Sequence, residues 1–329
     1  MILTAKYAEI YDGQIKVLEE KFTNLLKDAK PDSLYDPCKY IITSGGKRLR
    51  PFLVLISAKA AGGDFAQAYN AAVAVELLHN FTLVHDDIMD KADLRRGRET
   101  VHVKYGLNPA ILSGDNLVAI AYKNLILDCR INITEILNEF TCGLIEVCEG
   151  QSYDTDFETT DDVSIEQYLL MIRKKTAVMA EMCCKVGGLL ATTDHSIVDA
   201  LGNFGLNLGM AFQIQDDLLD IMADQEKFGK KVGGDLVEGK KTFLYIRALE
   251  KSEGTDREKL LEVTRNKGID WNDVGFYRNL YIKLGVIEAA ESEIKKYTEI
   301  ALESLNKLPE TEARHTLEWL ANALIKRAK

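Results

Sequence analysis

The chain contains no proline between Pro109 and Pro309, so the residue that most strongly interrupts helices is missing from its entire central part. Apolar residues gather there, and in the segment before it, in runs that are too long for strands and too apolar for surface helices. These runs predict buried helices over residues 71–85, 108–128, 133–150, 163–191 and 196–223. No strand-like alternation accompanies them, so the sequence predicts an all-α fold.

Short polar clusters separate the predicted helices, but nothing in the sequence marks a boundary between domains. The breaks fall at residues 44–46, 61–64, 192–195 and 227–239. Residues 256–267 and 280–328 are more charged and suit peripheral helices. Since 47% of the residues are hydrophobic and no flexible linker is present, we expect residues 1–329 to form one large helical domain.

Composition and charge exclude several classes of protein. The net charge of −10 is opposite to what a broad nucleic-acid-binding face requires. The 6 cysteines lack the spacing of a zinc site, which favours reduced, buried thiols. No apolar run reaches the ~18 residues of a membrane span, and the first residues are too polar for a signal peptide. We expect a cytoplasmic protein that binds no nucleic acid.

The motif D-D-x-x-D occurs twice, each time at the end of an apolar run, at Asp86–Asp90 and at Asp216–Asp220. In a helix, the first and last aspartates of the motif stand at i and i+4 and share one face. Carboxylates crowded at the edge of an apolar core repel each other and lose hydration, so they normally need a cation. A single copy on a surface helix would suit a solvated face, but two copies in apolar helices favour a metal site. These oxygen ligands suit Mg²⁺, which commonly binds substrate phosphates as well.

Basic residues that suit phosphate occur in four places along the chain. They are the segments 45–51 (GGKRLRP), 93–97 (DLRRG), 174–177 (KKTA) and 229–242, which contains two GKK triplets. Lysine and arginine supply charge and directed hydrogen bonds, and glycine lets the backbone approach a phosphate closely. The two arginines after the first aspartate cluster suit either an ion-pair network with those aspartates or a clamp for diphosphate.

The segment 234–240 begins like the phosphate-binding loop of nucleotide hydrolases, G-x-x-x-x-G-K. Lys241 stands where such a loop needs serine or threonine to bind Mg²⁺, and no strand precedes the segment. We therefore reject a nucleotide hydrolase.

Three other polar residues leave two interpretations open. His79, within an apolar run, suits either core packing or a contact with phosphate. Gln151 and Asp154 follow a predicted helix, so they suit either a helix cap or an outer shell of the metal site.

In combination, these motifs resemble the trans-isoprenyl (polyprenyl) diphosphate synthases. The matching segments lie between about residues 40 and 245, in the family's order and spacing, and are GGKRLRP, ELLHNFTLVHDDIMD, RRG, EGQSYD, KTA, FQIQDDLLD and DLVEGKKT. The resemblance implies a single large helical bundle of the isoprenoid synthase type around a deep central cavity. It also implies that the two aspartate clusters face each other across the mouth of this cavity, and that the protein is a homodimer.

The resemblance further implies a role for each polar group. The metal ligands are Asp86, Asp90 and Asp216, supported by Asp87, Asp154, Asp217 and Asp220. The cofactor is Mg²⁺, about three ions, for which Mn²⁺ can substitute. The allylic diphosphate is held by Arg95, Lys175, Lys230 and Lys240, and isopentenyl diphosphate by Lys47, Arg50, His79 and Arg96. Thr176 and Gln213 lie near the developing allylic cation.

The implied reaction needs no protein nucleophile. Mg²⁺ and the basic residues stabilise the negative charge of the departing diphosphate. The double bond of isopentenyl diphosphate attacks the allylic cation, and a proton is then lost. An apolar cavity keeps water away from the cation.

Product length depends on residues that precede the first cluster on the same helix. Leu78, Phe81 and Thr82 stand eight, five and four positions before Asp86. An aromatic residue at the fifth position without one at the fourth resembles the archaeal-type geranylgeranyl synthases. We therefore predict a C20 product from dimethylallyl, geranyl or farnesyl diphosphate. A farnesyl product, a product of C25 or longer, and a floor formed by another helix stay open.

Three other functions compete with chain elongation. A terpene cyclase also ionises an allylic diphosphate, but it has no need for the second set of basic residues, such as Lys47, Arg50 and Arg96. A non-catalytic partner subunit can dispense with the aspartate motifs, and both are intact here. A metal-dependent phosphatase needs an activated water and no large apolar cavity. Chain elongation is therefore the predicted function.

Overall fold

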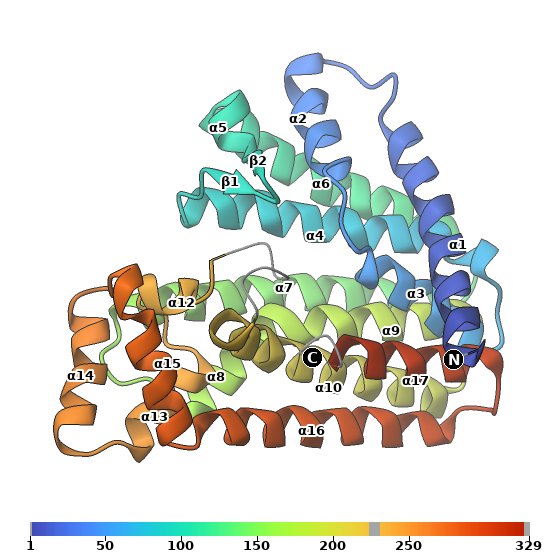
Figure 1. Cartoon of the computed structure of the whole chain (residues 1–329). Coiled ribbons are helices and arrows are strands. Elements are labelled where there is room, and N and C mark those ends of the chain that lie inside the picture. Colours follow the sequence, from blue (N-terminus) through green and yellow to red (C-terminus); the bar gives the residue numbers. More distant parts are fainter. Residues whose placement is uncertain (1, 224–230, 326–329) are drawn as a thin grey trace. The chain divides into compact units, whose positions relative to one another are not determined.

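The computed structural model describes residues 2–223 and 231–325. Helices make up most of this part, and its only strands are β1 (Leu94–Arg95) and β2 (Arg98–Glu99) (Figure 1). The all-α prediction is confirmed. The hairpin was not predicted, because strands of 2 residues are too short to show alternation. None of the described helices combines the length and the apolar character that crossing a membrane requires.

The chain forms two compact units. The first comprises Met1–Thr141, Met182–Leu201 and Lys307–Trp319, and the second comprises Cys142–Glu181, Gly202–Asn306 and Leu320–Lys329. Four long helices contribute residues to both units, as does a short 3-10 turn at Leu305–Lys307. These helices are α7 (Ile133–Thr159), α9 (Val178–Ala191), α10 (His195–Met222) and α17 (Glu312–Ile325). The prediction of one domain over residues 1–329 stays a prediction.

The remaining helices of the first unit lie in its N-terminal part. They are α1 (Ile2–Leu25), α2 (Asp32–Ile42), α3 (Leu49–Ala60), α4 (Tyr69–Met89), α5 (Val101–Tyr105) and α6 (Leu107–Asp128), with a 3-10 turn at Phe65–Gln67. Helices α4 and α6 lie side by side (Figure 1). Every residue of α4 from Ala71 to Leu78 is buried, which explains why all of them except Glu76 are apolar.

The second unit adds shorter helices. They are α8 (Ile165–Ile172), the π-helical turn η2 (Arg173–Ala177), α12 (Gly234–Val237), α13 (Phe243–Lys251), α14 (Gly254–Arg265), α15 (Val274–Lys283) and α16 (Val286–Ser304), with a 3-10 turn at Trp271–Asp273. The apolar core of this unit includes Ile214, Phe243, Leu260 and Tyr281.

The predicted helices agree with α4, α6 and α10, but two others differ. The run 133–150 continues as α7 to Thr159, so Gln151 and Asp154 lie inside a helix and the capping interpretation is wrong. The run 163–191 begins at Ile165, because Ser164 and Gln167 form a capping box, and η2 interrupts it. A local change of helix type does not alter the apolar pattern, so η2 could not be predicted from the pattern of residues.

Candidate functional site

The first aspartate cluster forms the C-terminal end of α4, where its three carboxylates have different surroundings. Asp87 is buried, Asp86 is partly exposed and Asp90 is exposed. A helix turns by ~100° from one residue to the next, and this rotation directs Asp87 toward the protein. Arg95 Nε donates a hydrogen bond to Asp87 Oδ1 at 2.7 Å. Burial raises the pKa of Asp87, and the charge of Arg95 partly offsets this rise.

A tight hairpin directs two adjacent arginines to different partners. β1 and β2 pair antiparallel, with Arg95 opposite Arg98. Arg96 and Gly97 both have positive φ, at 53° and 73°, as the two-residue turn of such a hairpin requires. Arg95 therefore reaches Asp87, while Arg96 Nη1 donates to the carbonyl oxygen of Gly45. The ion pair that the sequence left open is present at Arg95, and its contact with diphosphate stays a prediction.

The glycine-rich segment before α3 brings cationic groups around His79. Arg50 Nη1 lies 3.3 Å from His79 Nε2. The Arg96 guanidinium lies so close to Gly46 that a Cβ there would stand 2.9 Å from Nη1. Burial and the charges of Arg50, Arg96 and Arg95 hold the pKa of His79 well below its usual range. The neutral imidazole thus accepts the Arg50 hydrogen bond, and the gathered positive charge favours an anionic ligand.

Arg48 stands between Lys47 and Arg50 in the sequence, but its side chain is fully buried. It forms ion pairs with Glu19 at 2.7 Å and with Glu76 at 2.6 Å. Its φ of +47° is in the left-handed region, so the chain reverses here. The motifs alone do not distinguish Arg48 from its neighbours, although Glu76, an acidic residue in the most apolar part of α4, was an available signal. The buried pairs fix the backbone at Arg48, between Lys47, which is exposed, and Arg50, which is partly exposed.

The second aspartate cluster, near the end of α10, repeats the arrangement of the first. Asp217 is buried and Asp216 is exposed. Asp217 accepts hydrogen bonds from the hydroxyl of Tyr168, from Gln213 Nε2 at 3.1 Å and from the backbone nitrogen of Phe243 at 3.1 Å. Burial raises the pKa of Asp217 to about 6, although these donors favour the carboxylate. In both clusters the fold itself therefore holds the middle aspartate.

The segment after α10 adds an acidic residue that the sequence analysis missed. Asp220 Oδ2 accepts a hydrogen bond from the backbone nitrogen of Asp235 at 3.0 Å. Burial and the nearby cluster aspartates raise the pKa of Asp235 to about 8. Lys240 lies 4.0 Å from Asp235 and 2.7 Å from Glu238. Although burial favours the neutral amine, these acids raise the pKa of Lys240. Lys230 lies outside the described residues.

The π-helical turn η2 places two predicted site residues beside polar partners. Lys175 Nζ lies 2.6 Å from Asp154 Oδ2 on α7. The Thr176 hydroxyl donates to Gln213 Oε1 on α10 at 2.9 Å. The structure thus pairs Lys175 with Asp154 and Thr176 with Gln213. All four residues were predicted from the sequence to belong to one site. Turns of this type occur frequently at functional sites.

The carboxylates fit a magnesium site that is completed by substrate. No three histidine, cysteine, aspartate or glutamate side chains within residues 2–223 and 231–325 gather closely enough to hold a metal ion alone. Mg²⁺ is commonly bound by one or two carboxylates together with water and phosphate oxygens, so a preformed cage is not required. Asp87 Oδ2 is buried and has no hydrogen-bond partner in the described part of the chain. A water molecule bound to a cation at Asp86 and Asp90 would supply that missing donor.

The three residues predicted to limit product length differ in exposure. Leu78 is buried, whereas Phe81 and Thr82 are partly exposed. The Thr82 hydroxyl donates to the carbonyl oxygen of His79 at 2.8 Å within the same helix. The Phe81 ring contacts the His85 ring, with centroids 4.8 Å apart. Their role in product length stays a prediction.

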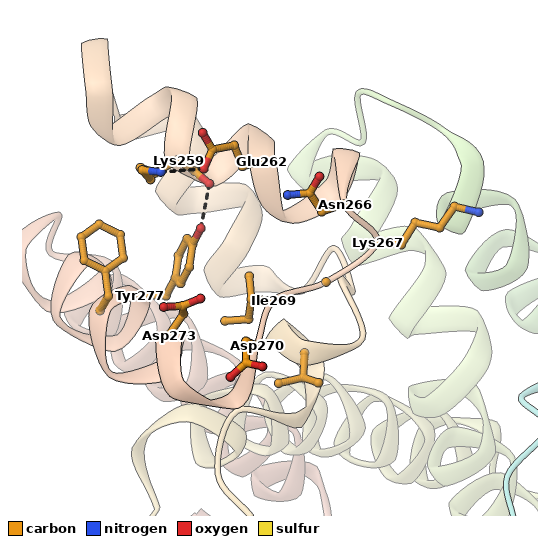
Figure 2. A pocket seen from close by; sticks show the side chains of 11 residues that line it. Lys259, Glu262, Asn266, Lys267, Ile269, Asp270, Asp273 and Tyr277 are labelled. Atoms are coloured by element: carbon orange, nitrogen blue, oxygen red, sulfur yellow. Dashed lines mark hydrogen bonds and ion pairs between the residues drawn. The ribbon is translucent and has the colours of Figure 1, made fainter.

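A pocket of about 720 Å³ lies in the second unit, and none of the predicted site residues lines it (Figure 2). Opposite charges are mixed in its wall, where Lys259 Nζ lies 2.7 Å from Glu262 Oε2. The Tyr277 hydroxyl donates to the carbonyl oxygen of Lys259 at 2.9 Å. Because its wall carries three acidic side chains (Glu262, Asp270 and Asp273) against two lysines, this pocket is a poorer match for a diphosphate than the basic residues around His79. Its wall consists of Val237, Lys259, Glu262, Asn266, Lys267, Gly268, Ile269, Asp270, Asp273, Phe276 and Tyr277.

Comparison with known proteins identifies relatives over nearly the whole chain. Residues 31–276 match the family model described as polyprenyl synthetase. The geranylgeranyl pyrophosphate synthase of Geoglobus acetivorans is 39% identical over 322 residues, which cover 97% of this chain and 99% of that protein. The geranylfarnesyl diphosphate synthase of Natronomonas pharaonis is 36% identical, with 95% of each chain covered.

A solved structure has the same fold. The geranylgeranyl pyrophosphate synthetase of Pyrococcus horikoshii superposes with a TM-score of 0.91 at 39% sequence identity, covering 99% of this chain and 98% of that one. The match extends over the helices that carry both aspartate clusters, and it agrees with the all-α fold expected from the sequence.

Proposed function

Because the chain belongs to the polyprenyl synthetase family, we propose that it joins isopentenyl diphosphate to an allylic diphosphate and releases geranylgeranyl diphosphate as its main product. The observation that carries this proposal is the 39% identity, over 97% of the chain, to a protein named geranylgeranyl pyrophosphate synthase. The basic residues around His79, together with the two aspartate clusters, give the chain groups suited to two diphosphate substrates.

The residues of the first unit suggest how isopentenyl diphosphate binds. Arg50 contacts His79, the charge of Arg96 also acts on this imidazole, and Lys47 is exposed on the adjoining segment. The forked donors of the arginines suit diphosphate oxygens, and their mutual repulsion falls when an anion binds. We assign this substrate to Lys47, Arg50, His79 and Arg96.

The allylic diphosphate is assigned to Arg95, Lys175, Lys230 and Lys240. Asp87 holds Arg95 and Asp154 holds Lys175, so both cations are oriented before substrate arrives. Orientation in advance matters because charge develops on the diphosphate as the C–O bond breaks. Thr176 and Gln213, which bond to each other, place oxygen atoms suited to stabilising the allylic cation.

Magnesium is the proposed cofactor, with Asp86, Asp90 and Asp216 as ligands and Asp87, Asp154, Asp217 and Asp220 as support. When bound, Mg²⁺ neutralises the charge of the leaving diphosphate. The buried middle aspartates favour this role, because each is fixed by hydrogen bonds and orients the helix end that carries the outer ones.

A homodimer is also proposed. Six large apolar side chains on α6 and the start of α7 are exposed, namely Leu107, Ile111, Leu112, Ile126, Leu127 and Ile133. Large exposed apolar side chains favour association, and most soluble oligomers consist of identical copies of one chain. Size-exclusion chromatography with light scattering tests this: a dimer is expected, and Leu127→Glu should shift the mass toward a monomer.

The function is tested by incubating the purified chain with Mg²⁺, isopentenyl diphosphate and each of dimethylallyl, geranyl and farnesyl diphosphate. The lengths of the dephosphorylated products are then measured by chromatography and mass spectrometry. A dominant C20 product is expected with each primer. A C15 or C25 product would retain the reaction and refute the product assignment, with C25 matching the Natronomonas relative's name. Folded protein that forms no new prenyl chain would refute the proposed function.

A further inference from the structure

Phe81 and His85 are four residues apart on α4 and therefore lie on the same face of the helix. Their ring centroids are 4.8 Å apart, and the ring planes are inclined by 65°, which is an edge-to-face contact. Phe81 is partly exposed. Its ring position therefore depends on its neighbour more than the position of a fully buried ring would, and His85 is the aromatic neighbour that restrains it.

Helix α6 provides a fitted place for the His85 ring. A Cβ at Gly114 would stand 2.6 Å from His85 Cδ2, closer than two carbon atoms can approach. The imidazole therefore lies directly against the backbone of α6, in space that any other residue at position 114 would fill. The same imidazole contacts the Phe81 ring, so His85 connects α6 to Phe81.

One hydrogen bond to α6 orients the imidazole. His85 Nε2 lies 3.3 Å from the carbonyl oxygen of Ile111. A carbonyl can only accept, so Nε2 carries the hydrogen in this contact. Asp115 Oδ1 lies 3.9 Å from the same nitrogen and favours a hydrogen there as well. His85 is thus held by its packing against Gly114 and its hydrogen bond to Ile111, and in turn limits where Phe81 can move.

From these contacts we infer that His85 is a positioning residue that determines product length by holding the Phe81 ring. This inference rests on the proposed function and on the prediction from the sequence that Phe81 stops the growing chain at C20. His85 does not touch the chain in this account. It prevents the Phe81 ring from rotating away when the growing end presses on it, and Gly114 is required because it makes room for the imidazole.

The experiment compares product lengths made by the wild type, His85→Ala, Gly114→Ala, Phe81→Ala and the double variant Phe81→Ala/His85→Ala. Each reaction contains Mg²⁺, farnesyl diphosphate and excess isopentenyl diphosphate. The ratio of products longer than C20 to C20 is measured within each sample, so a loss of rate or of folded protein cancels. His195→Ala is the matched control, because this exposed histidine also pairs with an acid, Glu135, at 3.8 Å.

The interaction between two aromatic rings of this kind corresponds to a roughly two- to tenfold change in a relative rate. His85→Ala and Gly114→Ala should therefore raise the ratio of longer products to C20 by about that factor. Phe81→Ala should raise it further, and the double variant should match Phe81→Ala, because His85 acts through that ring. His195→Ala should give the wild-type ratio.

The inference is overturned if His85→Ala and Gly114→Ala keep the wild-type ratio while Phe81→Ala lengthens the product. It is also overturned if the double variant exceeds Phe81→Ala, since His85 would then act independently, or if Phe81→Ala itself causes no lengthening. Failure of the proposed function is seen separately, as a wild type that forms no condensation product.

Discussion

At the scale of single residues, each aspartate cluster combines two kinds of carboxylate. The middle residues, Asp87 and Asp217, are buried and bonded to Arg95 or to Tyr168 and Phe243. Among the outer residues, Asp86 is partly exposed, and Asp90 and Asp216 are exposed. Each motif therefore anchors itself with its middle carboxylate, and the second also through Asp220, which accepts a hydrogen bond from the Asp235 backbone. The remaining outer carboxylates suit a cation shared with substrate.

We predict that Asp216→Asn lowers kcat/KM by about 100- to 1000-fold without loss of folding. Removing one charge that helps to neutralise the leaving group has effects of this size. Steady-state kinetics measures the change, and circular dichroism checks the fold. Asp199→Asn, an exposed change on the same helix, is the control and should be neutral. Equal kinetics for the two variants would exclude Asp216 from the metal site.

Arg48 carries a prediction about stability. Arg48→Met would leave Glu76 buried without its partner, and breaking a buried ion pair in this way costs about 3–5 kcal/mol. Urea denaturation measures the loss. Lys295→Met breaks a pair whose side chains are 75% and 59% exposed, so it should change the free energy of unfolding by less than about 1 kcal/mol. Similar losses for both variants would contradict the structural role given to Arg48.

At the scale of elements, the π-helical turn η2 depends on two glycines of neighbouring helices. A Cβ at Gly150 of α7 would stand 2.6 Å from Lys175 Cα, and one at Gly209 of α10 would stand 2.6 Å from Ala177 Cα. Because backbone is the obstacle in both cases, η2 must move if either glycine acquires a side chain. Lys175 and Thr176 would then move with it.

Gly150→Ala should therefore destabilise the protein by about 1–3 kcal/mol through overpacking, and should lower kcat more than the loss of folded protein explains. Thermal denaturation and kinetics on the folded fraction separate the two effects. Gly275→Ala on α15 is the matched control, because a Cβ there meets nothing within 4 Å. Unchanged kcat in folded Gly150→Ala would show that η2 tolerates the displacement.

The contact between α6 and the start of α4 carries a prediction about pH. Asp128, the last residue of α6, accepts hydrogen bonds from the Ala71 backbone and from Asn70 Nδ2, both at 2.8 Å. Burial nevertheless raises the pKa of Asp128 above its ordinary value of 3.8. The folded protein then holds this proton more tightly than the unfolded chain does. The contribution of Asp128 to stability therefore falls as the pH rises from about 3.8 through the raised pKa, and it stays low above that value.

Asp128→Asn keeps an acceptor for the Ala71 amide and removes the charge. The variant should accordingly gain stability relative to the wild type as the pH rises through this range. Denaturant titrations at about one-unit steps between roughly pH 4 and pH 8 measure the difference in free energy of unfolding between the two proteins. A difference that stays constant with pH would contradict the raised pKa.

At the scale of the whole molecule, the protein and its proposed diphosphate substrates both carry negative charge. The net charge of −10 repels diphosphate at long range, so binding depends on local arginines and lysines and on cations held by the aspartates. We predict that inorganic diphosphate with Mg²⁺ raises Tm by about 3–6 °C near 100 times its Kd. With EDTA in place of Mg²⁺, diphosphate should give little or none of this shift. A full shift in EDTA would mean that the lysines and arginines suffice without metal.

Much of the fold and the site could be predicted from local sequence. Helices α4, α6 and α10 were predicted closely, because an apolar run without proline has few other structures available. The Lys175–Asp154 and Thr176–Gln213 pairs join residues that the motifs had already placed in one site. The cytoplasmic location, Mg²⁺ as cofactor, the homodimer and the roles of individual site residues stay predictions.

Other features could not be predicted, because they depend on contacts between distant residues. Arg48 looked like its neighbours Lys47 and Arg50, and only its burial against Glu19 and Glu76 separates it from them. Asp235 and Tyr168 joined the second cluster through packing of α8 and α12 near α10.

The sequence by itself therefore determined the helical fold class and the chemistry of the site, since helix formation and residue type are local properties. The tertiary structure decided which aspartate of each cluster is buried, which arginine is bonded to an aspartate, and which ring supports Phe81. These choices depend on the orientation of side chains toward neighbours that are far away in the sequence. Burial and electrostatic interaction fix that orientation only after the chain has folded.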